Sequence, residues 1–260
     1  MKMLSIQEIK NQYPTDLHKF DRGLLREYLQ YQILGIIFSH KIGLKLSFLG
    51  GTCLRIVHKS KRFSEDLDFD NKNLTLHEFK ELSNYIKRKL ELLGYTVELK
   101  EFRKLAFHCY IKFPKLLFKE GLSPLEKEKV LIHLDTFDQG VNYKSGRFIL
   151  NKFDIFDQIL TTPKEIILSQ KLWTITQRKR AKGRDFYDIM FLFQNTKPDI
   201  SFLKVKFGTD DRDLIKEEII NHCNGFNWDY LVNDVSPFLQ TNEDAEKIRL
   251  FPKFLEQITF

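Results

Sequence analysis

The chain has 260 residues, a length that suits one large domain or two modest ones. Hydrophobic residues make up 42% and charged residues 30%, proportions that exclude a disordered, collagen-like or coiled-coil protein. Lys and Arg outnumber Asp and Glu by 42 to 35, and the net charge of +7 favours a polyanionic partner without requiring one.

Cysteine and histidine spacing excludes two further classes of protein. Cys53, Cys109 and Cys223 are widely separated, and the seven histidines form no HxxxH pair, so neither a disulfide framework nor a zinc hydrolase is indicated. Residues 1–10 lack the apolar core of a signal peptide, and the longest apolar run, 33–38, is too short to span a bilayer. These features predict a cytoplasmic protein with no membrane partner.

Hydrophobic periodicity and capping signals predict both helices and strands in the first 160 residues. The expected helices are a short one opened by Ser5 and Glu8 and ended by Pro14, then 21–40, 52–58 and 75–93. The expected strands are 46–49, 65–70, 95–102, 105–113, 129–137 and 147–153. A helix between strands, followed by strands in succession, predicts a mixed sheet of the α/β or α+β class.

After residue 160 the strand pattern stops and helical signals follow. Thr162, Pro163 and Glu165 supply an N-cap, a first-turn proline and an acid, which together predict a helix start. The expected helices run over about 163–178, 184–194, 211–222 and 244–256. The sequence therefore predicts a sheet-containing domain over 1–160 and a helical domain over 161–260.

The most informative stretch is GGTCLR at 50–55, followed by RFSEDLDFD at 62–70. Alternation along a strand would put Asp66, Asp68 and Asp70 on one face, where three like charges repel. A divalent cation removes that cost, and hard carboxylate oxygens suit Mg²⁺ or Mn²⁺. The alternative is an exposed acidic edge strand that discourages aggregation.

The glycine pair before these acids has two interpretations. Gly50 and Gly51 allow close approach to the backbone, and a glycine turn leading into a helix N-terminus can cradle phosphates. Thr52 would add a hydroxyl donor, and the phosphates would lie beside the aspartates. A plain turn is the alternative for a glycine pair taken alone.

These residues resemble the first signature of the AbiEii/AbiGii abortive-infection nucleotidyltransferases, toxins of type IV toxin–antitoxin systems in the DNA polymerase β-like superfamily. The resemblance implies a polymerase β-like mixed sheet with flanking helices, followed by a helical half that completes the nucleotide site. It assigns Asp66 and Asp68 to metal binding and Arg55 to nucleotide binding, whereas Asp70 is an extra acid. Thr52 stands where the superfamily more often has Ser.

A third carboxylate is expected on a later strand. Asp135 ends the hydrophobic run at 130–135, and the resemblance implies that it completes the metal site. Its chemical role would be to bind metal and to deprotonate the attacking hydroxyl. An ordinary strand-end Asp is the alternative, and Asp138 is the second candidate for the role.

Two later segments, ILSQKLW and KGRDFYD, resemble the family's later signatures. Lys171 and Arg178 are seven residues apart, which predicts one shared helix face directed at triphosphate oxygens. Asp185 and Asp188 are expected to orient Lys171 or to contact the nucleotide, and Arg184 joins the predicted nucleotide-binding set. A solvated basic connection with ordinary i,i+3 pairs is the alternative.

The resemblance implies metal-dependent transfer of a nucleotide from an NTP to an acceptor hydroxyl, with release of pyrophosphate. Family members include enzymes that add nucleotides to tRNA 3′ ends, and an antitoxin encoded nearby is an implied partner. Two alternatives stay open: a small-molecule nucleotidyltransferase of the antibiotic-modifying kind, and a catalytically silent nucleic-acid-binding domain. A continuous positive surface track would favour RNA, whereas clustered carboxylates argue against a silent binding module.

Overall fold

The computed structural model describes residues 3–103 and 106–260, and the chain divides into two compact units. The first unit comprises Met1–His58, Ser64–Gly140 and Ser145–Thr161. The second comprises Lys59–Phe63, Val141–Lys144 and Thr162–Phe260. Two short segments from the first 160 residues thus belong to the second unit. The sequence-based division into two domains at 160 stays a prediction.

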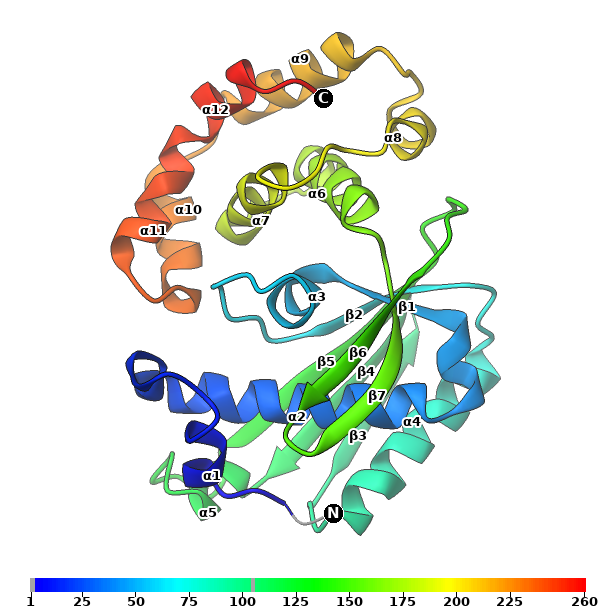
Figure 1. Ribbon diagram of the computed structural model, residues 1–260, viewed down its shortest axis with the longest axis vertical. Coiled ribbons are helices and arrows are strands. Elements are labelled where there is room, and N and C mark those ends of the chain that lie inside the picture. Colours follow the sequence, from blue (N-terminus) through cyan, green and yellow to red (C-terminus); the bar gives the residue numbers. More distant parts are fainter. Residues whose placement is uncertain (1–2, 104–105) are drawn as a thin grey trace. The chain divides into compact units, whose positions relative to one another are not determined.

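A mixed seven-stranded sheet forms the centre of the first unit (Figure 1). Its strands are β1 (Leu46–Leu49), β2 (Leu67–Asn71), β3 (Glu98–Arg103), β4 (Phe107–Pro114), β5 (Lys129–Phe137), β6 (Gly146–Lys152) and β7 (Ile155–Thr161). Their order in space is β3-β4-β5-β2-β1-β7-β6. β2 pairs with β5 and β1 with β7 in parallel, and the other neighbours are antiparallel. The predicted mixed sheet is therefore confirmed.

The first unit contains the four predicted helices, within two residues of their predicted starts, and a short helix, α5 (Leu116–Lys119), that was not predicted. The predicted helices are α1 (Ile6–Lys10), α2 (Asp21–Phe38), α3 (Gly50–Ile56) and α4 (Leu76–Leu92), with 3₁₀ turns at Thr15–Phe20 and Lys41–Lys45. Both predicted capping boxes are present, at Ser5 with Glu8 and at Thr75 with Glu78. Each box satisfies backbone donors that the first helical turn leaves unpaired.

Helices cover one face of the β3–β5 part of the sheet. Phe79 of α4 stacks on Phe107 of β4 with ring centroids 5.3 Å apart, and α4 also contacts α2. Alternate residues of β4 and β5 are buried on this side: Cys109, Ile111, Val130, Ile132 and Leu134. The intervening residues are partly exposed and, apart from Pro114 and Leu131, polar or aromatic, so the opposite face of these strands is mainly polar.

The β6–β7 hairpin differs from the sequence prediction, which placed a strand only at 147–153. The strands pair in register from Gly146 with Thr161 to Lys152 with Ile155, so the turn is Phe153-Asp154. Both turn residues have positive φ, 57° and 61°. A two-residue hairpin turn of this kind favours Asn-Gly or Asp-Gly. The turn escaped prediction because neither residue is glycine.

The second unit is helical. Its helices are α6 (Lys164–Gln177), α7 (Gly183–Phe193), α8 (Ile200–Phe207), α9 (Arg212–Cys223), α10 (Trp228–Val235), α11 (Asn242–Glu246) and α12 (Phe251–Gln257). The single helix predicted over 244–256 is wrong, because a 3₁₀ turn at Lys247–Leu250 separates α11 from α12. Pro252 stands in the first turn of α12, the only helical turn that tolerates a residue without a backbone N–H. The helices α8 and α10 were not predicted.

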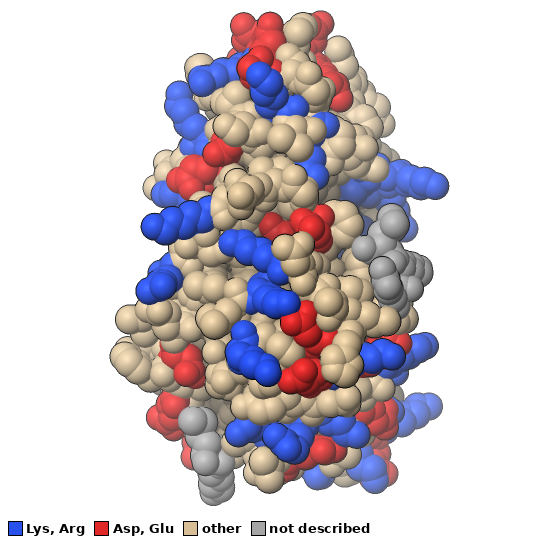
Figure 2. Space-filling view, turned by 90° about the vertical axis from the view of Figure 1, so that its right-hand side faces the viewer, with Lys and Arg blue, Asp and Glu red and all other residues tan. Residues whose placement is uncertain are grey.

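Basic and acidic side chains are interspersed on the face drawn in Figure 2. The Lys and Arg residues there are separated by acidic and uncharged ones, so on that face the positive excess is spread out rather than gathered into a track. Within the described part of the chain, no helix has the length and apolarity that crossing a bilayer requires.

Candidate active site

The strand register brings two of the three predicted acids together. Asp68 of β2 lies opposite Asp135 of β5 in the parallel ladder, and opposite Leu49 of β1 on its other side. Asp66 immediately precedes β2, which starts at Leu67 and not at the predicted residue 65. The side chains of Asp66 and Asp135 are 35% and 32% exposed. These three acids are therefore reachable from solvent at the centre of the sheet.

The glycine turn after β1 packs directly against Asp68. Gly50 has φ of +79°, and a Cβ placed on it would lie 2.2 Å from Asp68 Oδ2 and 2.9 Å from Asp68 Cγ. Any other residue would thus meet both backbone strain and a clash with the carboxylate. Gly50 is required here because the Asp68 side chain occupies the space that a side chain would need.

Each of the other two acids is bound by a histidine that sequence reasoning missed. His108 Nδ1 of β4 lies 2.8 Å from Asp135 Oδ1, and His133 Nδ1 of β5 lies 3.2 Å from Asp66 Oδ1. His133 stands two residues before Asp135 on the same strand, and this alternation is a signal that could have been read. His108 could not have been found, because only the β4–β5 register places it opposite Asp135.

Three other polar residues of the predicted motif have different roles. The Thr52 hydroxyl donates to the Asp66 carbonyl oxygen and is fully buried, so it holds the chain in place at Asp66. Asp70 is 3% exposed and accepts a hydrogen bond from the Gln139 N–H. Asp138 accepts one from the Gly140 N–H in the loop after β5. Asp70 and Asp138 thus stabilise the loop that follows β5.

The three acids have the chemistry of a divalent-cation site, although their side chains do not point to one common position. Among residues 3–103 and 106–260, no three His, Cys, Asp or Glu side chains are grouped as a bound cation needs. Two of the three carboxylates are turned toward imidazoles instead. Carboxylate oxygens from adjacent strands are the ligands that Mg²⁺ and Mn²⁺ prefer. The donor set therefore fits such a cation in its chemistry.

Arg55, predicted to bind nucleotide, forms a buried ion pair. Its Nε lies 2.7 Å from Glu27 Oε2, and the two side chains are 10% and 7% exposed. Glu27 also accepts a hydrogen bond from the Tyr13 hydroxyl at 2.7 Å. Burial, followed by the charge of Glu27, raises the pKa of Tyr13 above its usual range. In this arrangement Arg55 anchors α3 to α2.

Five charged side chains of the second unit form a network that we call the α6–α7 ion cluster: Arg62, Lys171, Arg178, Asp185 and Asp188. Arg62 contacts Asp188 twice, with Nε–Oδ1 at 2.9 Å and Nη2–Oδ2 at 2.8 Å. Lys171 Nζ lies 2.7 Å from Asp185 Oδ1 and 3.0 Å from Asp188 Oδ2. Arg178 Nε lies 2.8 Å from Asp185 Oδ2. Each carboxylate is therefore held by two cations.

Burial and charge act in opposite directions on this cluster. Burial alone would raise the pKa of Asp188, but the charges and hydrogen bonds of Arg62 and Lys171 outweigh it and hold that pKa below its usual value. Burial likewise lowers the pKa of Lys171, whereas Asp185 and Asp188 raise it, with a net upward shift. Both groups are therefore charged at neutral pH.

Lys171 and Arg178 meet at Asp185, but not on one helix face. The helix that was predicted to continue to Arg178 ends at Gln177, and Arg178 has extended φ and ψ of −74° and 127°. Arg178 therefore reaches Asp185 from outside α6. Arg184 lies over the Phe238 ring, with its Cζ 4.9 Å from the centroid. Arg62 received no role from the sequence, although it stands inside the first signature.

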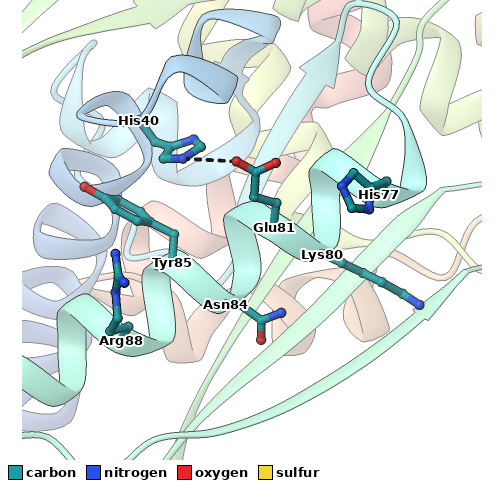
Figure 3. A pocket seen from close by; sticks show the side chains of 7 residues that line it. All are labelled: His40, His77, Lys80, Glu81, Asn84, Tyr85 and Arg88. Carbon is teal, nitrogen blue, oxygen red and sulfur yellow. Dashed lines mark ion pairs between the residues drawn. The ribbon is translucent and has the colours of Figure 1, made fainter.

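A cavity of about 560 Å³ lies elsewhere on the first unit (Figure 3). Seven residues of α4 and the turn after α2 line it: His40, His77, Lys80, Glu81, Asn84, Tyr85 and Arg88. His40 Nε2 lies 3.6 Å from Glu81 Oε1, and the His40 and Tyr85 rings are 4.6 Å apart. None of these residues belongs to the acid group, and α4 packs on the opposite face of the sheet from Asp135.

Comparison with known proteins assigns the family. The model of the nucleotidyl transferase AbiEii toxin, type IV toxin–antitoxin system, matches residues 35–249. The fold is similar to the crystal structure of JHP933 from Helicobacter pylori, with TM-score 0.55, 16% identity, and 91% and 92% of the two chains covered. It is also similar to an H. pylori protein described as a candidate nucleotidyltransferase, with TM-score 0.56, 16% identity, and 91% and 95% covered. A search of curated proteins gave no match. With most of its length matched, the chain belongs to the AbiEii nucleotidyltransferase toxin family of type IV toxin–antitoxin systems.

Proposed function

We propose that this nucleotidyltransferase uses a divalent metal to transfer a nucleotide from an NTP to an RNA hydroxyl, with a tRNA 3′ end as the acceptor. The observation that carries the proposal is the pairing of Asp68 with Asp135 across two parallel strands, with Asp66 immediately before β2. The net charge of +7 supports a polyanionic acceptor. The family implies an antitoxin partner, and the cytoplasm is where RNA and NTP meet.

In this proposal Asp66, Asp68 and Asp135 hold Mg²⁺ or Mn²⁺. Such a cation, when bound, neutralises charge on the transferred phosphoryl group and favours ionisation of the attacking hydroxyl. Asp135 accepts the hydroxyl proton, since it is a partly exposed carboxylate on the strand next to Asp68. His108 and His133 orient Asp135 and Asp66 through their Nδ1 contacts.

The remaining predicted residues are assigned to the nucleotide. The turn at Gly50, Gly51 and Thr52 is proposed to lie beside the β- and γ-phosphates, and its contact with Asp68 supports this assignment. Lys171, Arg178 and Arg184 are proposed to neutralise pyrophosphate, with Asp185 as the acid that orients Lys171 and Arg178. The predicted role of Arg55 at the nucleotide stays a prediction, because its ion pair with Glu27 explains its position.

The test is incubation of the full chain with each labelled NTP in turn, Mg²⁺ and total RNA. Label in a tRNA-sized band is expected from one or more NTPs, and an Asp68→Asn variant should give none. Label transferred to a small molecule and absent from RNA would refute the proposed acceptor. Transfer that persists in full after metal chelation would refute the metal site.

A further inference from the structure

Two rows of side chains cross the polar face of the sheet and end at the acids. In the first row, the strand register aligns Phe102, His108, Asp135 and Asp68 across β3, β4, β5 and β2. In the second row, it aligns Lys100, Tyr110 and His133. His133 then contacts Asp66. We call these the two ring rows, because each carries an aromatic ring and an imidazole before its carboxylate.

The rings within each row are stacked. The Phe102 and His108 centroids are 4.8 Å apart with planes 17° from parallel, and those of Tyr110 and His133 are 4.2 Å apart at 23°. Phe102 meets Tyr110 edge to face at 5.0 Å, so the two rows contact one another. The imidazoles remain partly exposed, with side-chain exposures of 22% for His108 and 30% for His133. The rows therefore form an ordered and partly exposed cluster of rings.

We propose that the two ring rows bind an unpaired base of the RNA acceptor next to the reacting hydroxyl, an inference that rests on the proposed function. In-line transfer puts the attacking and leaving oxygens on opposite sides of the phosphorus. The glycine turn proposed for the leaving phosphates follows β1, on one side of β2. The ring rows lie on β5, β4 and β3, on the other side of β2. The acceptor therefore approaches over the ring rows.

The chemistry of the rows suits a base more than a protein side chain. Aromatic rings on an exposed antiparallel sheet stack unpaired bases of single-stranded RNA, and every base has a face to stack. Lys100 is exposed and lies opposite Tyr110 in the strand register, where it can contact a phosphate of the bound RNA.

The experiment measures binding of a short fluorescent single-stranded RNA to the full chain by anisotropy, without NTP. The variants are Tyr110→Leu, which keeps apolar bulk but removes the ring, and Tyr110→Phe, which keeps the ring. Phe156→Ala is the matched control, because Phe156 is an aromatic residue 73% exposed on β7, outside the rows. Tyr110→Leu should weaken binding roughly 5- to 100-fold, whereas Tyr110→Phe and Phe156→Ala should bind as the unmodified chain does.

Phe102→Leu provides a second test if Tyr110→Leu fails to fold, because β3 is an edge strand of the sheet. Unchanged binding in both Leu variants overturns the proposal, as does equal binding of the same RNA presented as a blunt duplex. A raised KM for NTP with unchanged RNA affinity would assign the rows to the incoming base and also overturn it. Ring-dependent RNA binding without transfer from any NTP would instead refute the proposed function alone.

Discussion

At the scale of single residues, the candidate site depends on one glycine. Gly50 supplies the positive φ at which α3 begins, and it leaves room for the Asp68 carboxylate. The sequence suggested that this glycine admits a phosphate. In the structure, the space beside Gly50 is occupied by the Asp68 side chain. Positioning of Asp68 therefore depends on a residue that has no side chain.

We expect Gly50→Ala to lose stability and transfer together. The positive φ costs about 1–2 kcal/mol for a residue with a Cβ, and the clash moves Asp68. Gly121→Ala is the matched control, because Gly121 has φ of +69° with nothing within 4 Å of the added carbon. Both variants should have a lower melting temperature than the unmodified chain, whereas nucleotide transfer should fail only in Gly50→Ala. Full activity in Gly50→Ala would contradict the close packing at Asp68.

Asp68→Asn tests the metal site at the same scale. A cation that binds only the folded chain raises its melting temperature, so Mg²⁺ should stabilise the unmodified chain. Asp68→Asn should lose both transfer and this stabilisation, while its stability without metal holds or rises because one clustered negative charge is gone. Asp138→Asn, in the loop after β5, should behave as the unmodified chain does. An undiminished Mg²⁺ shift in Asp68→Asn would remove Asp68 from the metal site.

At the scale of elements, α6 and α7 are joined by charge as well as by apolar packing. Asp188 is fully buried and Arg62 is 3% exposed at the side chain, and the two form a bidentate pair. Removing one partner of a buried pair leaves the other charge without compensation. The α6–α7 ion cluster therefore holds these helices in one arrangement.

Arg62→Met is expected to cost about 3–5 kcal/mol of unfolding free energy at pH 7. The pKa of Asp188 is lowered in the folded chain, so its contribution is present above the unfolded pKa, about 3.9, and is lost as pH falls through the folded value. The difference in unfolding free energy between the variant and the unmodified chain should therefore become smaller at acid pH. Denaturant unfolding at a series of pH values measures this difference. Lys247→Met, which breaks a partly exposed pair with Asp244, should leave the free energy of unfolding nearly unchanged. A difference independent of pH would exclude Asp188 as the titrating partner.

Sequence reasoning succeeded where signals are local. Capping boxes and apolar periodicity predicted α2 and α4, and alternation predicted β5, because each depends on neighbours within a few residues. It missed β7 because Phe153 adopts positive φ, held among the rings of Tyr13, Tyr28 and Tyr31. It found the acids through their motif. It could not find the ring rows, because strand register alone brings their residues together.

At the scale of the whole molecule, the family predicts a phenotype. Expression in a bacterial host should inhibit growth, and Asp68→Asn should relieve the inhibition at equal soluble protein, because it removes a carboxylate of the proposed reaction centre and leaves the fold intact. Colony counts with matched immunoblots provide the measurement. Asp138→Asn should remain as inhibitory as the unmodified chain. Equal inhibition by Asp68→Asn would attribute the effect to expression load.

The parallel pairings have a consequence for the order of events during synthesis. β2 needs β5, and β1 needs β7, whose last residue is Thr161. Pairings between distant segments form late, because the entropy cost of closing the loop comes before any stabilising contact is made. While β7 is still inside the ribosome, the nascent chain therefore lacks the strand that pairs with β1. Products terminated before β7 should accordingly lack the assembled sheet that positions the acids, and we expect them to be harmless to the cell that makes them.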